Sequence, residues 1–185
     1  MTSALWFLGR GTGIVALLMF TVTVVLGIVT RSGRSPAGLT RFGVADLHRT
    51  AALAGTGLVA VHVVSLLLDP FAQLRLVDLV VPFHAGYRPL WVGLGALALD
   101  SLVVLVGSSL LRYRIGPRLF RGLHWLAYAM WPFAFIHALG SGTDAATWWL
   151  RGVAATCALA VTAAVWWRST EGFHGRPSLD RRAAR

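Results

Sequence analysis

The stretch that decides the fold is LHRTAALAGTGLVAVH, residues 47–62, in which His48 and His62 stand at the two ends of a largely apolar run. A second stretch, RGLHWLAYAMWPFAFIH (residues 121–137), repeats this arrangement with His124 and His137. The hydrocarbon core of a bilayer is about 30 Å thick, and a helix needs about 20 mostly apolar residues to cross it. Both stretches belong to runs of that length, so we predict that these four histidines lie within membrane-spanning helices.

Five apolar runs are long enough to cross a bilayer. They cover residues 12–29, 47–68, 90–111, 119–139 and 147–167. We expect the first to be a retained span and not a signal peptide, because the segment after it lacks a small-residue cleavage site. The predicted fold is an all-α integral membrane protein, a bundle of five transmembrane helices. Residues 71–83 are too short to span and are expected to form an outer loop or a short outer amphipathic helix.

Composition and charge exclude several other classes. Of the 185 residues 56% are hydrophobic and only 13% charged, whereas soluble domains have about 45–50% and 25%. All seventeen basic residues are Arg, and the net charge is +10. They form short clusters between apolar runs, not the basic patch that nucleic acid requires, so no nucleic-acid partner is expected. The single Cys157 permits neither a disulfide framework nor a thiolate metal site.

The Arg clusters also predict the orientation. They follow the first, third and fifth spans, and the positive-inside rule places these segments in the cytoplasm, with the N-terminus outside. We therefore expect a multi-pass protein of the cell membrane, with a membrane domain over residues 1–167 and a cytoplasmic polar tail over 168–185.

The histidine spacing predicts a cofactor. Ionisable residues within a membrane are costly and are functional candidates. Fourteen residues bring a helix back to within about 40° of its starting direction and advance it by about 21 Å. The second and fourth spans run in the same direction, so His48 should lie level with His124, and His62 with His137. Two facing imidazole pairs between these spans are what two stacked six-coordinate haems require.

One spacing fits less well, and other readings of the histidines remain. Thirteen residues leave His124 and His137 about 140° apart on an ideal helix, and we expect Pro132 to bend the helix between them. The histidines could instead hydrogen-bond across helices. A zinc or copper site is a further alternative, although an axial separation of about 21 Å prevents all four side chains from meeting at one ion.

Further residues could assist the four histidines, and no catalytic residue is assigned. Gly55, seven residues from both histidines of its helix, would let the macrocycles or a neighbouring helix approach closely, or is ordinary packing. Arg49 and Arg121 are candidate partners of the anionic haem propionates. Asp100 could be protonated, paired or a proton-transfer step, and His84 could be a spare ligand, an acceptor-site residue or an ordinary surface residue.

The two histidine segments, together with WFLGRGTGIVALL (residues 6–18) and YRPLWVGLGALALD (residues 87–100), resemble the ferric reductase-like transmembrane domain. Ferric reductases, NADPH oxidases and the membrane haem subunit of bacterial methionine sulfoxide reductase systems share this domain. The resemblance covers about residues 6–144. It implies two haem b groups, the inner bound by His48 and His124 and the outer by His62 and His137.

The resemblance implies a transmembrane b-type cytochrome, here of a bacterial plasma membrane. It would pass electrons from a separate flavin reductase or quinol to an outer-face acceptor, namely a ferric chelate, oxygen or a partner oxidoreductase. Many relatives have six core helices against five expected here. The larger relatives also carry a flavin and nicotinamide domain, but no Gly-rich dinucleotide fingerprint occurs in this sequence.

Two further functions remain open. One is a haem-bearing membrane anchor for a separate redox enzyme, so whether the chain is itself an enzyme is left undecided. The other is a metal-handling or transport protein without haem, which the apolar residues between the histidine levels disfavour.

Overall fold

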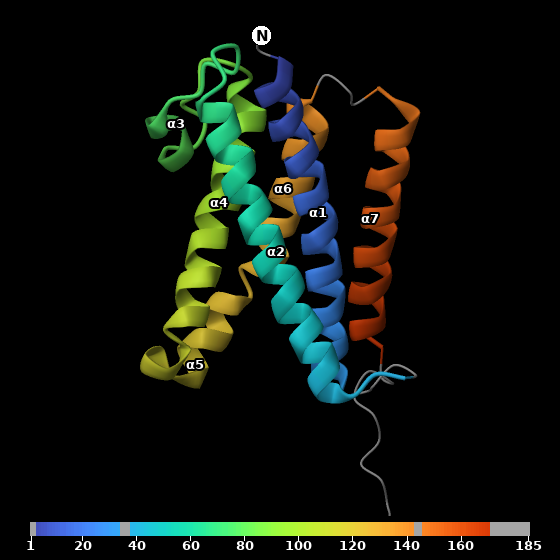
Figure 1. Cartoon of the computed structure of the whole chain (residues 1–185). Coiled ribbons are helices and arrows are strands. Elements are labelled where there is room, and N and C mark those ends of the chain that lie inside the picture. The colour runs from blue at the N-terminus through green and yellow to red at the C-terminus, as the bar shows by residue number, and fades with distance from the viewer. Residues whose placement is uncertain (1–2, 34–37, 143–145, 171–185) are drawn as a thin grey trace, which may run out of the picture.

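The structure is a computed structural model and describes residues 3–33, 38–142 and 146–170, which form helices joined by loops (Figure 1). No strand occurs within these ranges. The expected polar tail lies outside the described residues from 171 onward. In chain order the helices are α1 (Ser3–Ser32), α2 (Arg41–Leu67), α3 (Leu76–Val80), α4 (Pro89–Leu110), α5 (Arg112–His124), α6 (Ala127–Ser141) and α7 (Trp148–Arg168).

Four of these helices, α1, α2, α4 and α7, are long and apolar enough to cross a membrane. They correspond to four of the five expected spans, and the chain is a multi-pass membrane protein. The expectation of one continuous helix over residues 119–139 is wrong, because this part of the chain is divided between α5 and α6. Within residues 71–83 the structure has a five-residue helix, α3; that it is amphipathic and lies on the outer face stays a prediction.

The division between α5 and α6 lies at Trp125 and Leu126, six residues before Pro132, where we had expected a bend. Backbone hydrogen bonds here span three residues, from Leu126 to Leu123 at 3.0 Å and from Tyr128 to Trp125 at 3.0 Å. A three-residue turn rotates the chain by about 120° per residue, against about 100° in an α-helix. Each such residue therefore adds about 20° of rotation and reduces the angular mismatch between the two histidines that flank the break.

The long helices pack as two pairs. The first pair is α1 with α2 and the second is α4 with α6, while α1 also contacts α6 and α7. Figure 1 shows α7 on the side of α1 away from α4. The indole Nε1 of Trp131 in α6 donates a hydrogen bond to Oγ1 of Thr21 in α1 at 3.0 Å, and both residues are buried. Thus α1 lies at the centre of the bundle and connects the two pairs.

The two ends of the bundle differ. One end, here called the α3 end, carries α3 and the beginning of α1; the other, the α5 end, carries α5, the beginning of α2 and the end of α7 (Figure 1). At the α5 end, the side chain of Arg168 lies over the rings of Trp125 and Tyr128, 4.5 and 5.0 Å from their centroids. Its guanidinium also donates a hydrogen bond to the Tyr128 hydroxyl. These contacts attach α7 to the break between α5 and α6.

Local sequence explains where α2 begins and where α5 is interrupted. Thr40 caps α2, since its Oγ1 accepts a hydrogen bond from the backbone N–H of Gly43 at 3.0 Å. Gly116, within α5, has φ 77° and ψ 161°, which a residue with a side chain rarely adopts. Pro117 follows and begins the turn that carries α5 onward to His124.

Candidate functional site

Four histidines form two facing pairs between α2 and the α5–α6 segment. The ring centroids of His48 and His124 are 6.3 Å apart, with their planes at 63°. Those of His62 and His137 are 6.2 Å apart, with their planes at 84°. The first pair lies toward the α5 end and the second toward the α3 end. These are the pairs that the sequence spacing predicted, and α2 contributes one ring to each.

The separation within each pair suits two ligands of one metal ion. A metal–imidazole bond is about 2 Å long, so two imidazoles on opposite sides of one ion have ring centres about 6 Å apart. Both observed separations agree with that value. In the described part of the chain, no three His, Cys, Asp or Glu side chains converge on one point. Each level therefore offers an ion two ligands, which suits the two axial positions of a haem iron better than a zinc site.

Backbone carbonyls hold three of the four rings in position. Nδ1 of His48 donates to the carbonyl oxygen of Thr23 at 2.8 Å, and Nδ1 of His62 donates to that of Gly9 at 2.6 Å. Nδ1 of His137 donates to the carbonyl oxygen of Trp91 at 2.8 Å. Because the proton is on Nδ1, Nε2 keeps its lone pair and can bind a metal. Histidine ligands of metal ions commonly have such a partner on the second nitrogen.

A glycine lies four residues after each of these three acceptors. A Cβ atom at Gly13 would lie 2.9 Å from Nδ1 of His62, and one at Gly95 would lie 2.6 Å from Nδ1 of His137. At Gly27 the Cβ would lie 3.2 Å from Cε1 of His48. Side chains on a helix lean toward its N-terminus, so a side chain four residues later would cover the acceptor carbonyl. Glycine leaves the carbonyl open to an imidazole at each site, with the least room for a side chain at Gly13 and Gly95.

Sequence reasoning missed these glycines, although a signal was present. Gly13 and Gly27 are fourteen residues apart, as are His48 and His62. Two helices that share this spacing can repeat one contact at two levels, because fourteen residues is close to four helical turns.

The space beside the histidines could admit a flat cofactor. The backbones of α2 and α6 hardly approach each other, although their histidines face one another. A cavity of about 390 Å³ opens at the α3 end. Both imidazoles of that level line it, together with Gly13, Gly95 and a set of mainly apolar side chains from α1, α2, α4 and α6. The donor set, the ring separation and this apolar space all fit a haem.

A cation lines the same cavity. Arg10 of α1 borders it, as do His62 and His137. Sequence reasoning overlooked Arg10, because a single arginine near the start of an apolar run resembles a residue that only sets topology. Its place at the α3 end suits it to pair with an anionic group at the margin of the cavity.

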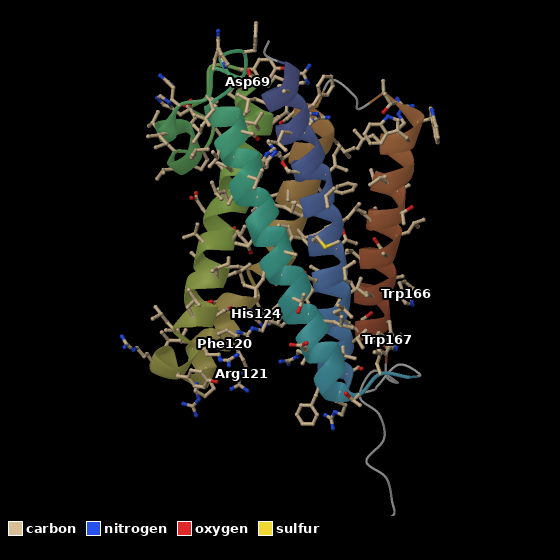
Figure 2. All side chains as sticks on the ribbon, in the orientation of Figure 1. Asp69, Phe120, Arg121, His124, Trp166 and Trp167 are labelled. Atoms are coloured by element: carbon tan, nitrogen blue, oxygen red, sulfur yellow. The ribbon has the colours of Figure 1, made fainter. Side chains whose placement is uncertain are left out.

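The two arginines singled out from the sequence lie at the opposite end. Arg49 and Arg121 are both exposed, and neither has a hydrogen bond or ion pair within the described residues. Figure 2 shows Arg121 and Phe120 close to His124 at the α5 end. The ring of Phe120 lies 5.3 Å from that of His124. That Arg49 and Arg121 bind propionates remains a prediction.

Gly55 faces α1. A Cβ atom at this position would lie 2.9 Å from the ring of Phe20. Gly55 therefore allows the neighbouring helix to approach closely, which is one of the two roles considered for it. Phe20 itself lines the cavity, so Gly55 borders the site through that ring.

The remaining ionisable candidates lie apart from the histidine pairs. Asp100 is half-buried on α4 and has no polar partner among the described residues. His84 belongs to a cluster at the α3 end, where its Nδ1 lies 3.1 Å from Arg75 and 3.3 Å from Asp78. The Arg75 guanidinium hydrogen-bonds the buried carboxylate of Asp78 and holds its pKa well below the usual range. This cluster connects the beginning of α3 to the loop before α4.

Comparison with known proteins identifies a family for the chain. Neither a curated protein nor a solved structure matches the chain. A family model described as "Ferric reductase like transmembrane component" matches residues 12–136, about two thirds of the sequence. The matched region contains His48, His62 and His124 and ends one residue before His137. The chain therefore belongs to the ferric reductase-like transmembrane family.

Proposed function

We propose that this protein is a transmembrane b-type cytochrome with two haems stacked between α2 and the α5–α6 segment. His48 and His124 would bind one haem iron, and His62 and His137 the other. The observation that carries this proposal is the pair of imidazole separations, 6.3 and 6.2 Å, each close to the value of about 6 Å that two imidazoles would have if they bound one ion between them. When bound, each haem iron supplies a centre that accepts and releases one electron.

The chain's own residues position the two centres and keep water from the space between them. The carbonyls of α1 and α4 fix the orientation of three imidazoles and raise their strength as ligands. Between the two histidine levels lies an apolar core that includes Phe20, Met130 and Trp131. A dry interior strengthens local electrostatic interactions, and the protein thereby tunes the reduction potentials of its cofactors.

The distribution of arginine supports an orientation of the protein in the membrane, and this orientation suggests the direction of electron transfer. The connections at the α5 end carry Arg112, Arg114, Arg118 and Arg121, and α2 begins there with Arg41. By the positive-inside rule this end faces the cytoplasm. We therefore place the electron donor, a separate flavin reductase or a membrane quinol, at the α5 end. The acceptor, a ferric chelate, oxygen or a partner oxidoreductase, would be reached from the α3 end.

A pyridine haemochrome assay on the full chain, purified in detergent, tests the proposal. We expect about two b-type haems per chain and a low-spin bis-histidine spectrum. The matched control is His84→Ala, which removes a histidine outside both pairs and should retain both haems. A folded protein without haem would refute the proposal. If haem is present but acceptor reduction begins only when a second protein is added, the chain is the haem-bearing anchor of a separate enzyme.

A further inference from the structure

The four imidazoles are not held alike. Three donate Nδ1–H to a backbone carbonyl, whereas Nδ1 of His124 is buried and has no hydrogen-bond partner within residues 3–33, 38–142 and 146–170. Loss of such a second partner typically weakens metal binding by about 10–100-fold. The pair at the α5 end therefore joins one supported ligand, His48, with one unsupported ligand.

The backbone at His124 is also less constrained. His124 is the last residue of α5, directly before the break at Trp125 and Leu126. The other three histidines lie inside α2 or α6, with helix on both sides. A residue at a helix end has fewer backbone hydrogen bonds to restrain it, so this ring can turn away from its partner at the lowest cost.

The sequence of α4 agrees with this asymmetry. In α1, the acceptor and glycine that serve His62 recur fourteen residues later for His48, as Gly9 with Gly13 and then Thr23 with Gly27. In α4, the equivalent positions fourteen residues after Trp91 and Gly95 are Leu105 and Ser109. There the carbonyl of Leu105 already accepts hydrogen bonds from the hydroxyls of Ser108 and Ser109, at 3.0 and 2.7 Å. Fourteen residues after its first acceptor and glycine, α4 therefore has neither a glycine nor an open carbonyl that could serve His124.

We infer that His124 is an exchangeable ligand, and that the centre at the α5 end can bind a small diatomic molecule such as carbon monoxide in its place. This inference rests on the proposed haem function. In the exchange one coordination bond to His124 breaks and one to the diatomic molecule forms, with no transfer of an electron or a proton. The centre of His62 and His137, in which both rings are supported, keeps both of its ligands.

A carbon monoxide titration of the chemically reduced full chain tests the inference, with the Soret absorbance as readout. Half of the haem should form the carbon monoxide complex, and the other half should require at least about tenfold more ligand. Equal binding by both haems, or by neither, would overturn the inference. Haem content is measured on the same samples: protein without haem fails the proposed function, whereas two haems that both resist carbon monoxide fail only this inference.

Variants show which centre reacts. His62→Ala, which should remove the haem at the α3 end, is expected to leave a remaining haem that binds carbon monoxide fully. His48→Ala should remove the haem at the α5 end and with it the high-affinity binding of carbon monoxide. High-affinity binding that survives in a protein lacking the α5-end haem would contradict the assignment.

A gain of binding provides an independent test. A methyl group at Gly95 would displace His137 from the Trp91 carbonyl, and Ser141→Ala would remove the hydroxyl that lies 3.1 Å from the same Nδ1. The double variant Gly95→Ala/Ser141→Ala should therefore create at the α3 end the defect that His124 has naturally. We expect this variant to bind carbon monoxide at both haems. Gly107→Ala on the same helix is the matched control, because nothing lies within 4 Å of its added Cβ atom, and it should behave as the unmodified protein. If the double variant retains two haems and binds no additional carbon monoxide, the hydrogen bond at Nδ1 does not govern exchange and the inference fails.

Discussion

Nδ1 of His48 in α2 donates a hydrogen bond to the carbonyl oxygen of Thr23 in α1 at 2.8 Å. A helix without any histidine thus sets the orientation of a ring on its neighbour. The same arrangement recurs one level away, between His62 and Gly9 at 2.6 Å. The contact between α1 and α2 therefore determines how both imidazoles of α2 present Nε2 to the space between the helix pairs.

The pairing of the histidines predicts which substitutions act on the same haem. His48→Ala and His124→Ala should each change only the haem at the α5 end and leave the other unaltered, because their rings face one another at 6.3 Å. Redox titration of each variant, followed at the haem absorbance, should show the same component unchanged. Changes in different components would separate the two residues and contradict the pairing.

The open carbonyl of Thr23 depends on Gly27. A methyl group there would lie 3.2 Å from the His48 ring, so Gly27→Ala should weaken or break the hydrogen bond. A less basic ligand stabilises the oxidised iron less, so the midpoint potential at this level should rise, and haem should be retained about 10–100-fold less tightly. Gly11→Ala on the same helix, with open space around it, is the control. Equal midpoint potentials in the two variants would show that Gly27 does not control the hydrogen bond of His48.

Gly55 is predicted to be a packing position against α1. Gly55→Leu forces a side chain into the ring of Phe20 and should destabilise the protein by about 1–3 kcal/mol. Gly57→Leu, two residues further along α2 and without neighbours within 4 Å, should be tolerated. Chemical denaturation in detergent measures both. If a second substitution, Phe20→Ala, restores the stability of Gly55→Leu, the clash with that ring is its cause; failure of the rescue would place the defect elsewhere.

The hydrogen bond from Trp131 to Thr21 should contribute to the stability of the bundle. Trp131→Phe and Thr21→Val each remove it, and a buried hydrogen bond of this kind contributes about 1 kcal/mol. In the double variant the bond is lost only once, so the two effects should not add. Thr56→Val, whose hydroxyl bonds only to its own helix at Ala52, is the control for the loss of a threonine. Additive effects on the free energy of unfolding would show that the two residues are not coupled.

The cluster at the α3 end predicts a dependence on pH. Arg75 lowers the pKa of Asp78, mainly through its hydrogen bond, so this carboxyl has a lower pKa in the folded than in the unfolded chain. Its contribution is present above the unfolded value of about 3.9 and is lost as pH falls toward the folded value. The protection of backbone amides against hydrogen exchange, corrected for the intrinsic rate at each pH, should fall in α3 and its flanking loop below about pH 4. Asp78→Asn should show fast exchange there at neutral pH as well; unchanged exchange would mean that the ion pair does not order the loop.

The histidine pairs were predictable because the helical rotation and rise per residue determine on which side of a helix, and at what depth in the membrane, each histidine lies. The spacing of His48 and His62 places both on one side of α2, and the shared direction of the two segments determines which partner each one meets. The approximate extents of α1, α2, α4 and α7 follow equally from apolar length.

Other features lay beyond the sequence for physical reasons. The break after His124 falls at a Trp–Leu pair that contains neither glycine nor proline, so no local signal marks it, whereas Pro132 is accommodated within α6. The acceptors on α1 and α4 are backbone carbonyls, which every residue possesses. Arg10 could be recognised only after the cavity that it borders was located.

The central place of α1 has a consequence for how this protein tolerates change. Although it contributes no histidine, this helix supplies two carbonyls, the two glycines that lie against the imidazoles and the partner of Trp131. A saturation mutagenesis library selected for assembled cytochrome should therefore show one intolerant stripe on α1, with positions separated by four and by fourteen residues. Invariant positions in such a library would show that α1 is essential for assembly of the cytochrome, although none of its side chains is a proposed ligand.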